Sequence, residues 1–263
     1  MFSLQLTLKN LPRGSSVLGL AAVAMGEDLA SQMALRSLDH VYQCGDVHVR
    51  RAVPLALALV SVSNPQLPVM DTLSKLSHDQ DEFVSMNAVL GLGVLGAGTN
   101  NSRIAAMLRN LAAFYSREPH HLFVVRIAQG LLHLGKGLCT LSPRSHEQQL
   151  LNRPALGALL ALLHLSLDLP ESLIKARHYL FFVLAAAVRP RFLMAVDEAG
   201  AQVPVQVRVG QAVDGVGQPG NPRYVYVYGL DFDFNLRWMM FVLFVASIFN
   251  IRVEIVFIAN ISS

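Results

Sequence analysis

The stretch Ala88-Val-Leu-Gly-Leu-Gly-Val-Leu-Gly-Ala-Gly-Thr-Asn-Asn101 is compatible with two very different folds. Its glycines Gly91, Gly93 and Gly96 match the G-x-G-x-x-G pattern of a dinucleotide-binding turn. Glu118 lies where such a fold places the acidic residue that holds a ribose. That turn needs a strand before its first glycine, whereas the residues before Gly91 carry their apolar side chains at helical spacing. The stretch therefore indicates either a nucleotide-binding enzyme or a tightly packed helix.

The same small-residue pattern returns along the chain. Similar stretches begin at residues 18, 55, 90 and 127, which are 37, 35 and 37 residues apart. Each period has room for two helices and two turns, the usual content of a helical solenoid unit. A glycine inside a helix costs about 1 kcal/mol relative to alanine, so its repeated use predicts neighbouring helices that approach closely. The predicted packing residues are Gly91, Gly93, Gly96, Gly130 and Ala56, and the nucleotide motif is then a coincidence of small residues.

Turn residues divide the repeats into helices. In the third copy, Gly98 is expected to take the left-handed conformation after one helix, and Ser102 to cap the next, at 103–115. Pro54 falls inside the helix of the second copy, which predicts a kink or a late start. Weaker helices are expected at 154–167 and 171–188.

The predicted fold class is mainly α, an α-solenoid of helical-hairpin repeats followed by a small β-rich C-terminal segment. The helical repeats occupy residues 1–189. Alternating valines and tyrosines between glycines and prolines predict strands within 190–228. Residues 229–263 form a divergent hydrophobic tail to which no fold is assigned.

The composition favours a chain that is buried by partners. It is 53% hydrophobic and only 15% charged, with a mean hydropathy of +0.43. The net charge of +3 is small and its basic residues are dispersed, which argues against a nucleic-acid partner. The most apolar segment, 238–249, is much shorter than the roughly 20 residues of a membrane-spanning helix, so a membrane partner is not expected. The N-terminus has no signal-peptide pattern.

No catalytic, cofactor-binding or metal-binding residue is predicted, and the residues that contact partners are not identified. Ser77-His78-Asp79 has the letters of a catalytic triad, but three adjacent residues cannot converge on one another, so a helix terminus is expected there. The remaining candidates are expected to lie in the core: His133 and His164 as hydrogen-bonded histidines, and Cys44 and Cys139 as small apolar residues.

Six segments of the chain resemble the proteasome/cyclosome repeat proteins. They are Val17–Asp28, Arg50–Leu59, Met70–Asp79, Gly96–Asn101, Val125–Gly130 and Val207–Asp214. The resemblance extends over residues 13–223 and implies part of a closed helical toroid in the base of the proteasome regulatory particle. It also implies a protein without catalysis of its own, in the cytoplasm and nucleus. The implied partners are the proteasome ATPase ring and other regulatory particle subunits, together with ubiquitin, ubiquitin-like shuttle proteins and a deubiquitinase.

The resemblance favours a non-catalytic scaffold that supports ubiquitin-dependent degradation, as a partial chain of a longer family type. A free-standing helical-repeat adaptor is the alternative, and a nucleotide-binding enzyme built on Gly91, Gly93 and Gly96 is a third. The tail departs from the family pattern after residue 223, which suggests an alternative exon, a retained intron or a gene-model error.

Overall fold

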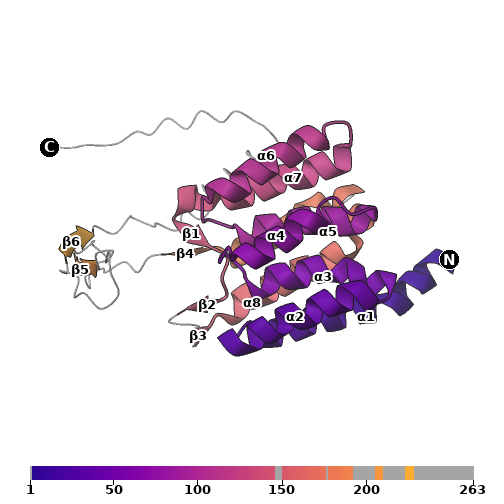
Figure 1. Ribbon diagram of the computed structural model, residues 1–263, viewed down its shortest axis with the longest axis horizontal. Coiled ribbons are helices and arrows are strands. Elements are labelled where there is room, and N and C mark those ends of the chain that lie inside the picture. The colour runs from indigo at the N-terminus through magenta and orange to yellow at the C-terminus, as the bar shows by residue number, and fades with distance from the viewer. Residues whose placement is uncertain (1, 146–149, 176, 192–204, 210–222, 228–263) are drawn as a thin grey trace.

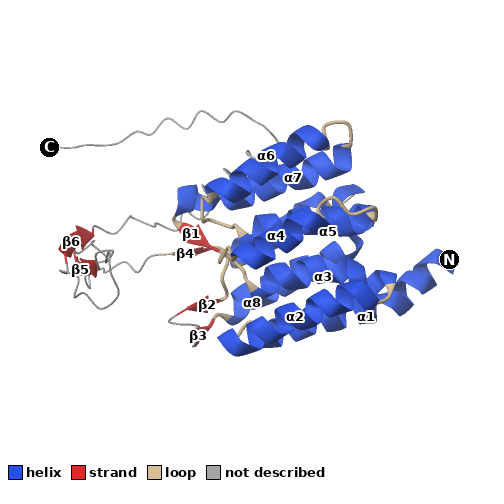
Figure 2. Cartoon of the chain, viewed as in Figure 1, coloured by secondary structure: helices blue, strands red, loops and turns tan. Residues whose placement is uncertain are grey.

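A computed structural model describes residues 2–145, 150–175, 177–191, 205–209 and 223–227. Helices dominate these residues, as Figure 2 shows. Seven helices come first: α1 (Phe2–Ala24), α2 (Asp28–Cys44), α3 (Val47–Val60), α4 (Leu67–Leu76), α5 (Glu82–Leu95), α6 (Ser102–Phe114) and α7 (Pro119–Leu132). They stack in chain order from α1 and α2 to α6 and α7 (Figure 1). This arrangement confirms the mainly α, solenoid-like architecture expected from the repeats.

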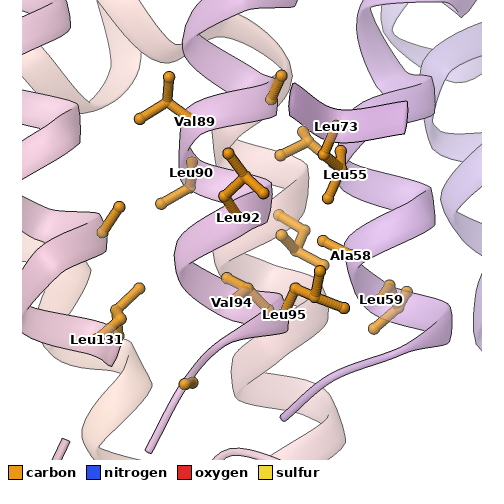
Figure 3. Close-up of a cluster of buried hydrophobic side chains, with 14 of the residues drawn as sticks. Leu55, Ala58, Leu59, Leu73, Val89, Leu90, Leu92, Val94, Leu95 and Leu131 are labelled. Carbon is orange, nitrogen blue, oxygen red and sulfur yellow. The ribbon is translucent and has the colours of Figure 1, made fainter. Parts of the chain in front are cut away.

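Every second helix belongs to an inner row. The helices α1, α3, α5 and α7 pack against one another in sequence, and α2, α4 and α6 cover them from outside. Helix α5 is the most enclosed, because each residue from Val84 to Leu95 is buried. Figure 3 shows its side chains between those of α3, α4 and α7, with Leu92 and Leu95 beside Leu55 and Leu59. The core of the molecule therefore follows the inner row.

The chain after α7 returns to the inner row. A short 3₁₀ turn, η1 (Leu134–Gly137), leads into β1 (Cys139–Thr140), and β2 (Arg144–Ser145) pairs antiparallel with β3 (Leu150–Leu151). Helix α8 (Arg153–Leu165) and the turn η2 (Ser166–Asp168) then contact α1, α3 and α5. The later segment thus covers part of the inner row. The π-helical η3 (Pro170–Lys175) and the 3₁₀ segment η4 (His178–Ala186) follow, and β4 (Arg189–Pro190) pairs with β1.

Several local expectations need correction. Asn101, not Ser102, caps α6, since its side chain accepts hydrogen bonds from the backbone N–H groups of residues 103 and 104. Helix α3 begins at Val47 and runs through Pro54, so the late start is wrong. The helix expected at 171–188 is two separate segments, because Arg177 (φ −127°, ψ 31°) lies outside the helical region between them. Gly98 does take the left-handed conformation, with φ 66°.

Strands β5 (Val205–Val209) and β6 (Arg223–Val227) pair antiparallel, with Val207 opposite Val225. Both coincide with valine- and tyrosine-rich runs that predict strands. The rest of residues 192–222 and the tail from 228 onward lie outside the described residues. A two-stranded pair does not establish the small β-rich segment expected for 190–228.

Candidate interaction surface

The glycines of the opening stretch lie where neighbouring helices approach one another so closely that a side chain would not fit. A Cβ atom on Gly93 would lie 2.7 Å from the Cα and 2.8 Å from the Cβ of Ala128 on α7. One on Gly91 would lie 3.1 Å from the carbonyl oxygen of Pro54 on α3, and one on Gly96 2.9 Å from a side-chain carbon of α7. The predicted packing residues are all buried: Gly91, Gly93, Gly96, Gly130 and Ala56. The close contacts confirm the packing role of Gly91, Gly93 and Gly96. For Gly130 and Ala56 the structure shows burial.

The nucleotide-binding interpretation of this stretch is wrong. Gly91 and Gly93 lie inside one continuous helix, Glu82–Leu95, with no strand before them. A phosphate loop needs free backbone N–H groups at the start of a helix, whereas these glycines lie near the end of one. Glu118, the candidate ribose ligand, directly precedes α7 and pairs with His121.

A Ser–His–Glu arrangement that the sequence analysis did not identify lies between α5 and α7. The hydroxyl oxygen of Ser85 is 2.9 Å from Nε2 of His121, and Nδ1 of His121 is 2.8 Å from a carboxylate oxygen of Glu118. The order matches nucleophile, base and orienting acid in a hydrolase. Ser85 and His121 are 2% and 4% exposed, however, so no substrate reaches the hydroxyl. The arrangement is a buried hydrogen-bond network that joins two repeats.

Tyr115 completes this network. Its ring stacks on the imidazole of His121, with centroids 4.3 Å apart and planes at 13°, and its hydroxyl donates a 2.6 Å hydrogen bond to the carbonyl of Ser77. Burial lowers the pKa of His121, which the nearby carboxylate of Glu118 only partly opposes. A neutral ring satisfies both neighbours when Nδ1–H donates to Glu118 and Nε2 accepts from Ser85. The signal in the sequence was the 36-residue separation of Ser85 and His121, close to the repeat spacing.

Other polar contacts also join residues about one repeat apart. The Asn87 amide donates a 2.9 Å hydrogen bond to the carbonyl of Arg51, and the Arg51 guanidinium pairs at 2.8 Å with Asp81. Comparable contacts link Tyr42 to Asp79, Arg103 to Asp71 and His133 to Asn100. Because the partners of each contact come from successive hairpins, these side chains fix how one hairpin sits on the next.

Two histidines and one cysteine lie elsewhere than expected. His133 directly follows α7, His164 lies in the last turn of α8, and both are exposed. His133 binds Asn100 at the surface. Cys139 is buried, and this burial raises the pKa of its thiol to about 11. Cys44 is exposed at the end of α2. Buried core positions are thus confirmed only for Cys139.

Ser77-His78-Asp79 forms a helix terminus, as predicted. Ser77 ends α4, His78 lies edge-on to the ring of Phe114, and the carboxylate of Asp79 accepts a hydrogen bond from Tyr42. Within the described part of the chain, no cluster of three or more histidines, cysteines and acids could hold a metal ion. Among the same residues, no helix combines the length and apolar character needed to cross a membrane. Segment 238–249 lies outside them.

Large apolar side chains are exposed on the first hairpin. Four of them lie on α1 and α2: Leu20, Val23, Leu29 and Met33. Val23 is 81% exposed, although it lies on an inner-row helix. We call these four residues and Gly19 the open face. Exposed apolar clusters of this kind are typical of protein–protein contacts.

Comparison with known proteins agrees with this architecture. Residues 87–119 match the proteasome/cyclosome repeat family. The chain is 53% identical over 217 residues to a 26S proteasome non-ATPase regulatory subunit 2 of Dictyostelium discoideum, and 51% identical over 216 residues to homolog A of that subunit in Arabidopsis thaliana. It is 47% identical over 210 residues to the 26S proteasome regulatory subunit rpn1 of Schizosaccharomyces pombe.

These alignments cover 80 to 82% of this chain but 24% of each of these three relatives, so the chain spans about a quarter of their length. The family model falls on α5, α6 and the loops around them, where Gly91, Gly93 and Asn101 have the packing and capping roles described above. The chain therefore belongs, as a partial chain, to the proteasome/cyclosome repeat proteins.

Proposed function

We propose that this chain is a non-catalytic scaffold of the proteasome regulatory particle base, which supports ubiquitin-dependent degradation through protein–protein docking. The observation that carries the proposal is the position of three polar side chains: Ser85, His121 and Asn87 are buried and bind neighbouring repeats. Side chains placed in this way build a rigid array and do not meet a substrate. The relatives are named as regulatory subunits of the 26S proteasome, which supports placing the array in that complex.

The proposed partners are the ATPase ring and the other subunits of the regulatory particle. Ubiquitin, ubiquitin-like shuttle proteins and a deubiquitinase are further proposed partners, by resemblance to the family alone. The same resemblance supports a location in the cytoplasm and nucleus. An exposed apolar face on a rigid helical array is the kind of surface on which such contacts form.

We also propose the domain limits expected from the sequence: helical repeats in 1–189, a β-rich segment in 190–228 and a separate tail in 229–263. The β1–β4 pair lies close to the first limit, since it joins Cys139 to Pro190. The β5–β6 pair supplies two strands of the second unit. Limited proteolysis should cut first near residues 190 and 229, and a single uncut fragment would refute the division.

Isolation of proteasomes from cells that express the tagged chain tests the proposed function. The chain should co-sediment with 26S particles and remain bound through a second affinity step on an ATPase subunit. The control is Gly93→Leu, whose side chain cannot fit against Ala128, and which should lose association together with its fold. A correctly folded chain that is absent from proteasome fractions but bound to other proteins would favour the free-standing adaptor.

A further inference from the structure

The turns that follow the inner helices share one backbone conformation. Ser63, Asn100 and Lys136 take the left-handed conformation, with φ of 54°, 51° and 55°, and lie 37 and 36 residues apart. The N–H of Ser63 donates a 3.3 Å hydrogen bond to the carbonyl of Val94, near the end of α5. The N–H of Asn100 donates one of 3.3 Å to the carbonyl of Leu132, at the end of α7. Because the last carbonyls of a helix accept bonds from outside it, each of these two turns is tied to the next inner helix.

The chain after α7 crosses these turns in reverse order. In the turn between α5 and α6, a Cβ on Gly98 would overlap the carbonyl oxygen of Cys139. In the turn between α3 and α4, the hydroxyl of Ser63 accepts a 3.0 Å hydrogen bond from the N–H of Leu141. The chain therefore passes from the third hairpin to the second between Cys139 and Leu141.

The same segment then reaches the first hairpin. In the turn between α1 and α2, a Cβ on Gly26 would lie 2.5 Å from a terminal guanidinium nitrogen of Arg144. Figure 1 shows β1 and β2, which begin and end this segment, along the same end of the stacked helices. We call residues 138–144 the strap. It contacts three hairpins, whereas the repeats of a solenoid ordinarily contact only their neighbours.

The length of the strap matches the spacing of the hairpins. Extended chain covers about 3.3 Å per residue, so the path from Cys139 to Arg144 covers about 17 Å. Packed helices lie about 8–10 Å apart, so the two steps between three successive inner helices cover about 16–20 Å. Cys139, Leu141 and Pro143 are buried and the residues between them are half-buried, as in a strand with one inward face. The strap is therefore nearly fully extended, and it fits only hairpins that are closely packed.

Arg189 holds the strap from the side of β4. Its guanidinium donates hydrogen bonds to the carbonyl of Ser142 and, at 3.1 Å, to the carbonyl of Arg144. Directly after β4, the N–H of Arg191 donates a 2.8 Å hydrogen bond to the carbonyl of Leu138. Arg191 thus holds the beginning of the strap, and Arg189 holds the part that lies between the second and the first hairpin.

We propose that the strap fixes the spacing of the first three hairpins and that Arg189 keeps the strap in place. Withdrawal of Arg189 releases the strap from Ser63 and Gly26, and the hairpins are then held only by their neighbours. The array therefore has a rigid and a flexible state, and the position of residues 189–191 selects between them. This device is independent of the scaffold function proposed above, because it requires no partner.

Hydrogen exchange of the full chain, followed residue by residue, tests the proposal. In Arg189→Met, the amides of Leu141 and Ser63 should exchange about tenfold faster or more, because the first binds the Ser63 hydroxyl and the second ties its turn to α5. The amide of Tyr115, in the turn between α6 and α7 at the opposite end of the helices, should keep its rate. The matched control is Arg191→Met, which removes an exposed guanidinium but keeps the backbone N–H, and it should change none of these rates.

Urea unfolding gives a second readout. The parent and Arg191→Met should unfold in one transition, because the strap couples the hairpins. Arg189→Met should unfold with a smaller slope of free energy against urea concentration, as should Ser63→Gly, which removes the hydroxyl but suits the left-handed backbone.

Three results would overturn the proposal. The first is faster exchange in Arg189→Met that is confined to residues 142–144, which would make the contact a local one. The second is an equal increase at Leu141 and Tyr115, which would show a general loss of stability. The third is an Arg189→Met variant that keeps the single transition and the slope of the parent.

Discussion

The closest approach between two inner helices gives the sharpest test of why the repeats contain glycine. Changing Gly93 to alanine adds one Cβ, which would lie 2.7 Å from the Cα of Ala128. Real Cβ atoms essentially never come this close to another heavy atom. The Cα of Ala128 is part of the α7 backbone, so it cannot move aside as the end of a flexible side chain would. The substitution therefore requires α5 and α7 to move apart.

Two opposing effects set the magnitude. Alanine in place of glycine favours a helix by about 1 kcal/mol. Overpacking of a tight core costs about 1–3 kcal/mol, and a backbone contact belongs to the upper part of that range. Gly93→Ala should therefore lower the free energy of unfolding by about 1–2 kcal/mol. At Gly157, a Cβ would have no neighbour within 4 Å, so the helix preference acts alone. Gly157→Ala should therefore raise the free energy of unfolding by up to about 1 kcal/mol.

Urea unfolding of the two variants and the parent, followed by circular dichroism at dilute protein concentration, measures both effects. Ala128→Gly alone should cost about 1 kcal/mol of helix preference. Combined with Gly93→Ala, it should cost less than the sum of the two single changes, because it removes the Cβ that lies 2.8 Å away. A Gly93→Ala variant as stable as Gly157→Ala would refute the close-packing argument. Glycine would then be tolerated at this position without being required.

Three further predictions concern single side chains. Asn101→Ala should cost about 1 kcal/mol of stability because α6 loses its cap, whereas Ser102→Ala should change stability by less than about 0.5 kcal/mol in the same urea titration. The pKa of His121 is lowered by burial from its ordinary value of 6.5, so the unfolded chain binds a proton more readily than the folded one. The melting temperature should therefore be fully maintained above pH 6.5 and fall as the pH decreases below it; His121→Gln should weaken this dependence, and an unchanged pH profile would contradict the assignment. A maleimide reagent should label Cys44 in the native chain and reach Cys139 only after unfolding, since Cys139 is buried with its pKa raised to about 11; mass spectrometry that finds native Cys139 labelled first would show that this burial is wrong.

The repeat architecture could be predicted from the sequence because it depends on local patterns. The spacing of the small-residue stretches at 18, 55, 90 and 127 predicted successive helical hairpins, and the structure places these stretches on α1, α3, α5 and α7. Burial on all sides of α5 follows from its continuous apolar sequence. Helix ends were less certain, since Asn101 and Ser102 are both good capping residues and only backbone geometry distinguishes them.

Contacts between repeats could not be predicted from the sequence alone. His121 lies in the first turn of α7 and His133 directly follows its last residue, yet His121 is buried and His133 is exposed. His121 meets Ser85 on the preceding inner helix, whereas His133 meets Asn100 in the turn between α5 and α6. The stacking of the helices also decides which glycines lie against a neighbouring helix and which have space around them. Sequence by itself determined that helices pack through small residues. Only the tertiary structure decided that Gly93 has a close neighbour and Gly157 has none within 4 Å, because that depends on how the helices stack.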